Sequence, residues 1–343
     1  MNKKITLMGM SQNELEDYCL SNDFPKFHGD QIFRWLYKNN NQELENVSNI
    51  PKKLKEKIKN DCDINLLKIK KKSISKIDKT IKFLFETKDY KFIESVSMID
   101  SDRHTVCISS QIGCNVDCDF CATGKMGIDR NLKVGEIVEQ LIEVKKNTNI
   151  PITNIVFMGM GEPFLNYRNV IESCKIFTNQ KAFNLGTKRI TISTAGVLPQ
   201  IDLFIKEKNK YKLAVSLNAP NDLIRDKIMP INKKWNINKL MLSLKNYNFF
   251  RSRVIMFEYV LLNGINDSVE NAIELSKLLK NFNCKVNLIP FNQILGNYKR
   301  SEDTTINKFA ETLKKYNIRV LIRWSKGEDI DAACGQLATK HES

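Results

Sequence analysis

From about residue 105 onward, short apolar segments alternate along the chain with amphipathic ones. The apolar segments predict strands, and the amphipathic ones, whose apolar residues recur three or four positions apart, predict helices. The predicted strands are 105–109, 153–158, 189–194, 211–217, 254–261, 284–289 and 318–323, and the predicted helices are 134–146, 167–179, 197–208, 236–248, 268–281 and 303–316. An alternation of this kind over about 220 residues implies a parallel sheet, either open or rolled into a full or partial barrel. The functional site of such a fold lies at the C-terminal ends of the strands.

The first 62 residues show a different, mainly helical pattern. Ser11 and Glu14 form a capping box at the start of one predicted helix, and Pro51 suits the first turn of another. The predicted helices are 11–20, 28–39 and 52–60, and extended stretches follow near 64–70, 80–86 and 91–98. The aromatic side chains of the second helix are expected in the core rather than on a base-stacking surface. We therefore expect a mainly helical N-terminal domain with a short extended linker over 1–95, and a β/α core over 96–343.

The excess of basic residues predicts a class of binding partner. The chain has 54 lysines and arginines against 39 acidic residues, a formal net charge of +15. The window 51–82 alone holds 12 lysines and four acidic residues, so its net charge is 12 − 4 = +8. A concentrated basic patch favours binding to a phosphate backbone. The alternative is free use of lysine in an AT-rich genome, which does not account for the clustering.

Neither a leader nor a membrane span is predicted. The first ten residues, MNKKITLMGM, lack the apolar stretch of a signal peptide, and no run approaches 18 apolar residues. The expected location is the cytoplasm, with a monomer as the default state. Thiols are reduced there, so clustered cysteines predict metal binding or catalysis. The four cysteines without partner spacing are expected to be small apolar groups in the core: Cys19, Cys62, Cys174 and Cys284.

Cys114, Cys118 and Cys121 form a C-x3-C-x2-C motif in the loop that follows the strand predicted at 105–109. Three thiolates on one short loop can hold three irons of a [4Fe–4S] cluster, whose fourth iron then stays open to another ligand. The alternative is a structural zinc site, which needs four protein ligands, usually in two spaced pairs. No second pair is present and His104 is the only histidine nearby, so the spacing favours the cluster.

This motif, with an aromatic residue before its last cysteine, resembles that of the radical S-adenosylmethionine (SAM) superfamily. Further motifs extend the resemblance over nearly the whole chain, to the bacterial radical SAM adenine-C2 RNA methyltransferase family (RlmN type). They are the stretches 107–114 (CISSQIGC), 159–163 (GMGEP), 193–196 (STAG), 216–220 (SLNAP) and 329–337 (DIDAACGQL). The resemblance implies an α/β fold, namely a partial (β/α)6-type radical SAM barrel with a small, mainly helical N-terminal domain. It also implies one [4Fe–4S] cluster and SAM as cofactors.

Two other functions remain open at this point. A sister family methylates adenine C8 at the same ribosomal site and shares the cysteines, but Pro163, the run 218–221 and the stretch 327–329 resemble the C2 family more closely. A function from another class is that of a non-catalytic, metal-dependent RNA-binding protein. It would explain the charge and the cysteine loop, but neither Cys107 nor Cys334.

The chemistry of the target atom explains why a radical enzyme is needed. C2 of adenine lies between two ring nitrogens and is electron-poor, so it cannot attack the SAM methyl group as a nucleophile. The resemblance implies that Cys334 takes a methyl group from one SAM, and that a second SAM supplies a deoxyadenosyl radical that removes a hydrogen from this methyl. The carbon radical adds to C2, and Cys107 then attacks the Cys334 sulfur, which releases the methylated base and forms a transient disulfide. The two cysteines must therefore meet, although 334 − 107 = 227 residues separate them.

The remaining site residues also follow from the resemblance. It makes Glu94 the base that removes the C2 proton, although its sequence context alone indicates a surface residue on a strand. The residues implied in SAM binding are Gly161 and Glu162 for the amino group, Ser193, Ser216, Leu217 and Asn218 for ribose and carboxylate, and Asn292 for adenine or ribose. Asn218 stands where many relatives have His, which puts a proton-transfer role there in doubt. The loop after Asn292 lacks the Pro common in relatives.

The implied partners are nucleic acids and an electron donor. The family resemblance points to 23S rRNA near the peptidyl-transferase centre, to tRNA, and to a flavodoxin-type reductant. The basic N-terminal domain over 1–95 would hold the RNA.

Overall fold

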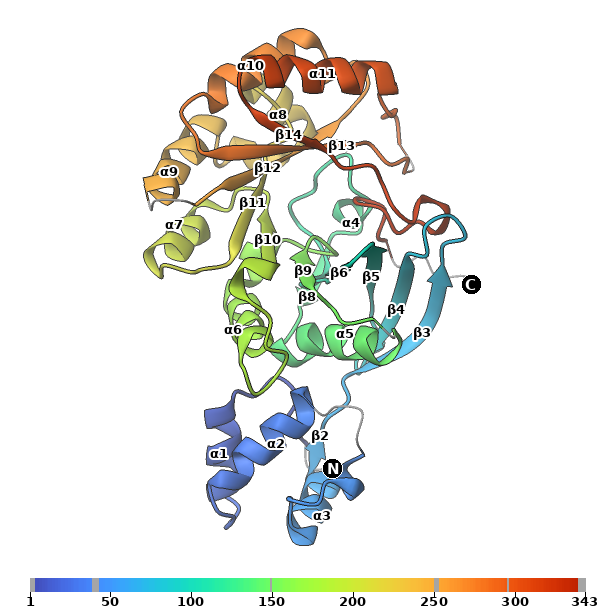
Figure 1. Ribbon diagram of the computed structural model, residues 1–343, viewed down its shortest axis with the longest axis vertical. Helices are drawn as coiled ribbons and strands as arrows, with labels where there is room; N and C mark the ends of the chain where they lie inside the picture. Colours follow the sequence, from blue (N-terminus) through green and yellow to red (C-terminus); the bar gives the residue numbers. More distant parts are fainter. Residues whose placement is uncertain (1–3, 39–42, 149, 250–252, 295, 339–343) are drawn as a thin grey trace.

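The computed structural model describes residues 4–38, 43–148, 150–249, 253–294 and 296–338, and Figure 1 shows their arrangement. Within these ranges a run of parallel strands forms the centre of the molecule, each hydrogen-bonded to the next along the chain. They are β6 (Arg103–Cys107), β9 (Asn154–Phe157), β10 (Ile190–Thr194), β11 (Lys212–Ser216), β12 (Ile255–Leu261), β13 (Cys284–Pro290) and β14 (Arg319–Ile322). Each coincides with a predicted strand, so the parallel β/α sheet is confirmed.

Helices between the strands cover the outer face of the curved sheet (Figure 1). They are α5 (Val134–Lys146), α6 (Tyr167–Thr178), α7 (Leu198–Lys206), α9 (Ile237–Phe249), α10 (Val269–Leu279) and α11 (Asp303–Lys315), and each was predicted from its apolar spacing. Since β14 follows α11, the strands and helices make a partial (β/α)6 barrel with one further strand. No helix in the described ranges is long and apolar enough to cross a membrane.

The central strands are buried on both faces of the sheet. All five residues of β10 and all four of β9 are buried. Continuous buried runs of this kind are typical of parallel strands, whose two faces are both covered. The sequence analysis missed α8 (Asp222–Ile228), a short helix that begins where the Asn221 side-chain oxygen accepts the N–H of Ile224 at 3.0 Å.

Beyond β6 the sheet continues in three antiparallel strands, β5 (Phe92–Asp100), β4 (Ile81–Thr87) and β3 (Leu67–Ile74). They occupy the stretch in which the sequence predicts a short extended linker, and residue 95 lies inside β5. Five successive residues of β5, 93–97, are buried, and β5 is paired on both sides. This extended segment is therefore part of the barrel sheet.

The helical unit lies at the end of the molecule away from β14 (Figure 1). It consists of α1 (Gln12–Leu20), α2 (Phe27–Tyr37) and α3 (Lys52–Asp61), with a short parallel pair β1 (Ile5–Thr6) and β2 (Cys62–Asp63). The predicted capping box is confirmed: the Ser11 hydroxyl oxygen accepts the Glu14 N–H at 3.3 Å, and the Glu14 carboxylate accepts the Ser11 N–H at 2.7 Å. Phe33, Trp35 and Tyr37 of α2 are buried, so these aromatic residues form core, as predicted.

Close contacts join the helical unit to the barrel. Gly9 has a φ of +98°, and a Cβ atom there would lie 2.4 Å from the backbone nitrogen of Gly135 at the start of α5, so a side chain does not fit. Lys181 after α6 forms an ion pair with Asp30 of α2, with 2.7 Å between nitrogen and oxygen. These contacts hold α1 and α2 against the outer layer of barrel helices.

Glu139 makes a pH-dependent contribution to the stability of this junction. It is 2% exposed on α5, where it accepts the backbone N–H of Leu66 at 2.7 Å, and burial raises its pKa to about 8. The unfolded chain loses this proton near the ordinary value of 4.5, so the free energy of unfolding falls as the pH rises from about 4.5 to about 8. We therefore expect Glu139→Gln to raise the melting temperature, relative to the wild type, by more at about pH 8 than at about pH 5. Circular dichroism would measure both melting temperatures, and an equal difference at the two pH values would contradict the expectation.

Candidate active site

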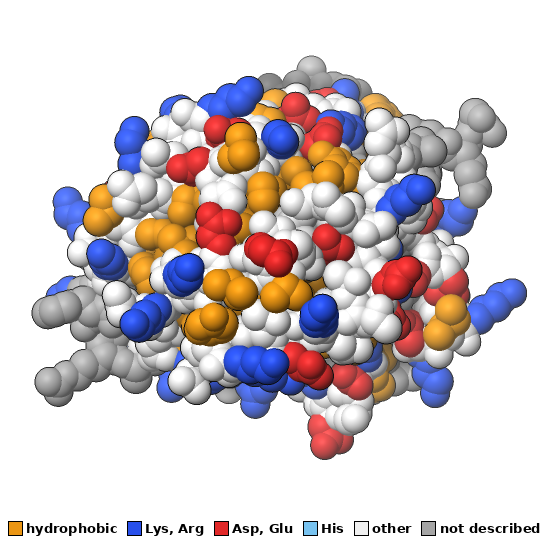
Figure 2. Space-filling model, turned by 90° about the horizontal axis from the view of Figure 1, so that it is seen from above, with side chains coloured by type: hydrophobic (Ala, Val, Ile, Leu, Met, Phe, Trp, Pro, Cys, Tyr) orange, Lys and Arg blue, Asp and Glu red, His pale blue; other side chains and the backbone are white. Residues whose placement is uncertain are grey.

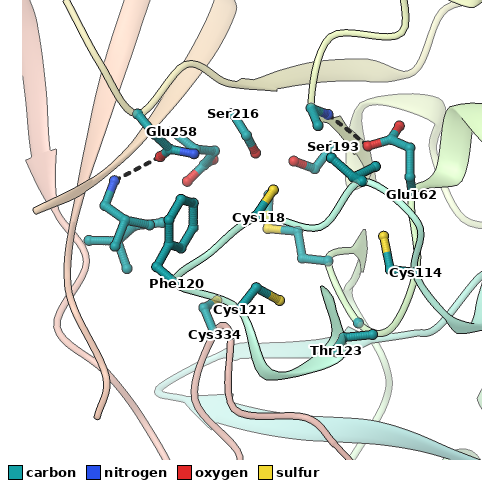
Figure 3. A pocket seen from close by; sticks show the side chains of 18 of the residues that line it. Cys114, Cys118, Phe120, Cys121, Thr123, Glu162, Ser193, Ser216, Glu258 and Cys334 are labelled. Carbon is teal, nitrogen blue, oxygen red and sulfur yellow. Dashed lines mark hydrogen bonds between the residues drawn. The ribbon is translucent and has the colours of Figure 1, made fainter. Parts of the chain in front are cut away.

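A cavity opens at the C-terminal ends of the parallel strands, inside the curve of the sheet, where the β/α pattern predicts a site (Figure 3). It holds about 940 Å³ of space free of protein atoms, part of it open to solvent. Its lining comes from the ends of successive strands and from the C-terminal segment, and includes Cys114, Cys118, Cys121, Met158, Gly161, Glu162, Ser193, Ser216, Asn218, Glu258, Asn292 and Cys334.

The cysteine motif lies between β7 (Gln111–Gly113) and α4 (Ala122–Lys125), and the chain then returns in β8 (Ile128–Asn131), which pairs with β7. The Cys114 N–H donates to the Gly127 carbonyl at 2.7 Å, and the Cys121 N–H donates to the Cys118 carbonyl at 3.0 Å. These bonds fold the loop back on itself. As a result the three thiols border one space on the same side of the cavity (Figure 3).

The three thiols fit an iron–sulfur cluster. Burial raises the pKa of Cys114 to about 12 and the pKa of Cys118 and Cys121 above its usual range, so the free thiols are protonated at neutral pH and a bound cation would displace the protons. In the described part of the chain, no three His, Cys, Asp or Glu side chains converge on one point, as a single metal ion would require. A cluster instead takes each thiolate at a separate iron, which an all-sulfur set spread around a space can provide.

Gly161 and Glu162 follow β9 and line the same cavity, where Figure 3 shows Glu162 on the side of Cys114. Gly161 has a φ of +94°, and a Cβ atom there would lie 2.4 Å from the Gln111 side chain, so the chain can turn here only at a glycine. The Glu162 carboxylate accepts the N–H of Ala195 at 2.7 Å and the N–H of Phe164 at 3.0 Å. Burial raises its pKa to about 7, and these hydrogen bonds oppose the rise. The carboxylate is therefore held rigidly, with lone pairs left for a ligand.

Ser193 and Ser216, at the ends of β10 and β11, both line the cavity. Asn218 lines it as well and has a φ of +58°, a conformation that Asn and His tolerate better than most residues, so the exchange of one for the other suits the backbone. Its side-chain oxygen accepts the N–H of Val260 at 2.9 Å. Leu217 differs from the other residues implied in SAM binding, because its side chain is fully buried in the hydrophobic core and does not line the cavity.

Asn292, after β13, contacts the segment that carries Cys334. Its side-chain nitrogen donates to the Cys334 carbonyl at 2.9 Å, and its oxygen accepts from the Ser325 hydroxyl. The same segment is bound to the cysteine loop, because the Ala122 N–H donates to the Gly335 carbonyl at 2.8 Å. Asn292 thus lines the cavity and also holds the segment that carries Cys334.

Cys107 ends β6 and lies close to Cys334. Burial raises the pKa of Cys107 to about 12, the neighbouring Cys334 thiol raises it further, and the Arg323 guanidinium opposes the rise. The pKa of Arg323 is raised in turn by Cys334, Glu258 and Cys107. Both cysteines are free thiols. Cys107 and Cys334 thus lie within electrostatic range of each other and of Arg323.

Glu94 of β5 is buried, which corrects the surface position that its sequence context indicates. Its carboxylate forms an ion pair with Lys82 at 3.1 Å and accepts the N–H of Ala338 at 3.0 Å. The reason is the pairing of β5 between β4 and β6, which no local pattern reveals. Glu94 is not among the cavity-lining residues, although it contacts the chain four residues beyond Cys334.

The C-terminal segment bridges the two ends of the open sheet. After β14 the Gly327 N–H donates to the Asp78 carboxylate at 2.8 Å, and Asp329 accepts the N–H of Lys76 at 3.0 Å. Both partners lie in the turn between β3 and β4, at the opposite end of the strand order from β14 (Figure 1). Cys334 is therefore carried on a strap across the gap in the barrel.

Three further charged residues at the site escaped the sequence analysis. Arg225 of α8 is fully buried and donates to the carbonyls of Ala195 at 2.7 Å and Leu217 at 2.9 Å, so it ties the ends of β10 and β11 together. Glu258 of β12 lines the cavity, and Arg323 lies beside the cysteine pair. Only Glu258 left a signal in the sequence, namely a single charged residue inside an apolar strand.

The other four cysteines are all buried, as predicted for small apolar core groups: Cys19, Cys62, Cys174 and Cys284. His104, the histidine nearest to the cysteine motif in sequence, is fully buried on β6. One ring nitrogen is hydrogen-bonded to Ser97 at 2.8 Å and the other to the Ile150 carbonyl at 3.0 Å. It is therefore a satisfied core residue.

Comparison with known proteins agrees with this site. The family model of the radical SAM superfamily matches residues 108–276, and that of the ribosomal RNA large subunit methyltransferase N-terminal domain matches residues 5–64. A probable dual-specificity RNA methyltransferase RlmN from Clostridium novyi (strain NT) is 43% identical over 332 residues, which cover 96% of this chain and 97% of the relative. A protein with the same description from Thermosipho melanesiensis is 44% identical over 312 residues, 91% of this chain and 92% of the relative.

A solved structure shows the same architecture. A radical SAM methyltransferase from Sphaerobacter thermophilus superimposes with a TM-score of 0.94 at 39% identity, and the match covers 98% of this chain and 100% of the other. The partial barrel and the N-terminal helices therefore recur together in one protein. By sequence and by fold, this chain belongs to the RlmN family of radical SAM RNA methyltransferases.

Proposed function

We propose that this enzyme methylates C2 of an adenosine in RNA, with a methylated Cys334 as the intermediate. The observation that supports this most directly is the meeting of Cys107 and Cys334, 227 residues apart in sequence, beside the cavity lined by the three-cysteine loop. A direct transfer of the methyl group from SAM to RNA would need no such pair. The proposed substrates are 23S rRNA and tRNA, in keeping with the dual specificity named in the relatives. The proposed location is the cytoplasm.

The chain's own residues supply the first half of the reaction. The Cys334 thiolate attacks the methyl group of one SAM, which forms a sulfur–carbon bond and releases S-adenosylhomocysteine. The Arg323 guanidinium interacts electrostatically with Cys334, so a cation stands beside the attacking sulfur. Cys114, Cys118 and Cys121 would hold the [4Fe–4S] cluster, which would supply the electron for reductive cleavage of a second SAM into methionine and a 5′-deoxyadenosyl radical. Removal of a hydrogen atom from the Cys334 methyl group then leaves a carbon radical, which bonds to C2.

Release of the product depends on Cys107. C2 must first lose its own proton to a base and one electron, which the oxidised [4Fe–4S] cluster would accept when bound. The Cys107 thiolate then attacks the Cys334 sulfur. A disulfide forms, the bond from sulfur to the new carbon breaks, and that carbon keeps the electron pair and takes a proton to become the methyl group. We propose Glu94 as the base for the C2 proton, since its carboxylate contacts the segment that carries Cys334.

The proposed SAM site follows the cavity lining. Gly161 and Glu162 would receive the amino group, and Ser193, Ser216 and Asn218 would face ribose and carboxylate. Leu217 can contribute only its backbone, because its side chain is fully buried in the core. Asn292 can meet adenine or ribose only if it shares or exchanges its present hydrogen bond to the Cys334 carbonyl.

The experiment that tests the function is an anaerobic reaction of the cluster-loaded enzyme with SAM, a flavodoxin-type reductant and a 23S rRNA fragment, followed by nucleoside mass spectrometry. We expect 2-methyladenosine with the wild type and none with Cys334→Ala. The appearance of 8-methyladenosine would be consistent with the radical mechanism but would reject C2 as the site of methylation. The absence of any methylated base from an enzyme with an intact cluster would reject the substrate.

The lysines of α3 are proposed to hold the RNA backbone. They lie at the end of the molecule away from α10 and α11. We expect the fourfold replacement of Lys52, Lys53, Lys55 and Lys57 by Glu to weaken RNA binding. The slope of log affinity against log salt concentration should also become less negative, by about 0.9 for each phosphate that the variant no longer neutralises. Filter binding between about 50 and 200 mM salt would measure both effects.

The matched control lies at the opposite end of the molecule. Figure 2 shows that end, where basic, acidic and hydrophobic side chains are interspersed rather than gathered by charge. Four exposed lysines of α10 and α11 can be reversed there to give the same change in net charge: Lys277, Lys308, Lys314 and Lys315. Equal decreases of affinity in the two variants would mean that only the net charge matters, which rejects α3 as the binding surface.

A further inference from the structure

Glu258 is a buried acid in a central strand of the barrel. It lies in the middle of β12, in register with Ser216 of β11 and Asn287 of β13, and is 3% exposed. It lines the cavity, and Figure 3 shows its carboxylate on the same side of the cavity as the hydroxyls of Ser216 and Ser193, opposite Cys121 and Cys334. The acid therefore faces the space that a ligand would fill.

The two carboxylate oxygens of Glu258 have different surroundings. Oε1 accepts a hydrogen bond from the Asn287 side-chain nitrogen at 3.1 Å. Oε2 is equally buried but has no hydrogen-bond partner among the described residues. Buried polar atoms without partners are rare, because they have lost water and gained nothing in exchange. An unpaired acceptor that borders a cavity indicates that a ligand supplies the missing donor.

The neighbours of Glu258 partly offset the effect of its burial. Burial raises the pKa of Glu258, but the Arg323 guanidinium and the Asn287 hydrogen bond both oppose the rise. Arg323 interacts electrostatically with this acid and with the cysteine pair, and its Nη1 atom is 3.3 Å from the sulfur of Met158, another residue of the lining. Arg323 thus lies within electrostatic range of both Glu258 and the reacting cysteines.

We propose that Glu258 is a recognition residue for adenosine, and that its Oε2 atom accepts a hydrogen bond from an N–H or O–H group of an adenosine in the cavity. The inference rests on the proposed function, which places two adenosines there in turn or together, one in SAM and one in the RNA. Each offers an exocyclic amine as a donor. SAM also offers two ribose hydroxyls, and an adenosine within RNA offers its 2′-hydroxyl. In both cases an uncharged N–H or O–H group of a nucleoside donates a hydrogen bond to Glu258. The experiment decides whether SAM or the RNA supplies it.

Asn287 makes Glu258→Gln an informative variant. The Asn287 nitrogen donates toward the Oε1 position, so a glutamine must place its own oxygen there to avoid two donors facing each other. Its amide nitrogen then points to the Oε2 position, where it presents a donor instead of an acceptor. The side chain keeps its shape while one hydrogen-bonding group reverses. A second variant, Glu258→Ala, removes the acceptor without adding a donor.

The first part of the test measures SAM affinity in the cluster-loaded enzyme without RNA, by equilibrium dialysis. The second measures binding of an RNA fragment that carries adenosine, purine riboside without the exocyclic amine, or 2′-deoxyadenosine at the target position. If SAM supplies the donor, Glu258→Gln weakens SAM binding by about 10- to 100-fold. If the target nucleotide supplies it, SAM binding is unchanged. The wild type then prefers adenosine over one of the two analogues by a similar factor, and Glu258→Gln loses that preference.

The control is Glu139→Gln, the same exchange at a buried acid of α5 that does not line the cavity. It should leave both affinities unchanged, and melting temperature and iron content should confirm that all variants are folded and loaded. Unchanged affinity for SAM together with unchanged preference among the three RNAs, in both Glu258 variants, would overturn the inference. Failure of the wild type to methylate any RNA would reject the proposed function alone, because the SAM measurement still tests Glu258.

Discussion

Replacing Cys107 with alanine will leave the enzyme covalently joined to its RNA. In the proposed reaction the new carbon is bonded to both C2 and the Cys334 sulfur until Cys107 attacks that sulfur. Cys107 is 5% exposed and lies close to Cys334, so no thiol of the solvent is expected to take its place efficiently. Each Cys107→Ala molecule should therefore react once and stop, with an RNA adduct approaching one per active site and almost no free methylated product.

Denaturing gel electrophoresis with labelled RNA, followed by mass spectrometry of the linked peptide, would measure this adduct. The double variant Cys107→Ala, Cys334→Ala should form none, because the methyl carrier is missing as well. Cys174→Ala is the matched control, since Cys174 is a fully buried cysteine on α6 and should leave turnover intact. Normal multiple turnover by Cys107→Ala would exclude the release step.

Loss of one thiol from the cysteine loop should have an equally large effect on a different measurement. With Cys118 replaced by alanine, two thiolates remain on the loop, too few to hold a [4Fe–4S] cluster. We expect iron and sulfide to fall well below four per chain after reconstitution, and the formation of 5′-deoxyadenosine from SAM and a reductant to disappear. Elemental analysis and liquid chromatography with mass spectrometry would measure the two effects.

The control for this variant is Cys284→Ala on β13, a buried cysteine outside the cavity lining. It should keep its iron and its cleavage of SAM. The two cysteine variants also separate two proposals, because Cys107→Ala should retain the iron that Cys118→Ala loses. Full iron content with active SAM cleavage in Cys118→Ala would show that Cys118 is not a ligand.

The fold was predictable where neighbours in sequence determine it. The capping box of Ser11 and Glu14, the six barrel helices and the parallel strands each leave a local pattern of apolar and polar residues, and each was found where it was predicted. The antiparallel strands β3–β5 were recognised as extended, but not as part of the barrel. Pairing between β5 and β6 is a contact between segments, and alternation within one segment does not reveal which partner it takes.

The site was predictable to the extent that its residues occur in motifs. The cysteine loop, the Gly161–Glu162 turn and the meeting of Cys107 with Cys334 were expected, and the structure places all of them around one cavity or beside it. The burial of Glu94 was not expected, because it depends on which strands pair with β5. Arg225 and Glu258 were missed for a related reason: one charged residue in an apolar segment shows neither what it faces nor which partner it lacks.

The strap that carries Cys334 has a consequence for the sensitivity of this enzyme to oxygen. Two of its carbonyls, those of Gly335 and Leu337, accept hydrogen bonds from Ala122 and Thr123, directly after the last cysteine of the loop. In the proposed reaction, the segment that delivers the methyl group is therefore also the one that packs against the cysteine loop. Each displacement of this segment toward a bulky RNA would open a path for dissolved gas to the metal. Inactivation in air should then follow the number of catalytic cycles more closely than elapsed time, and an idle enzyme should outlast a working one.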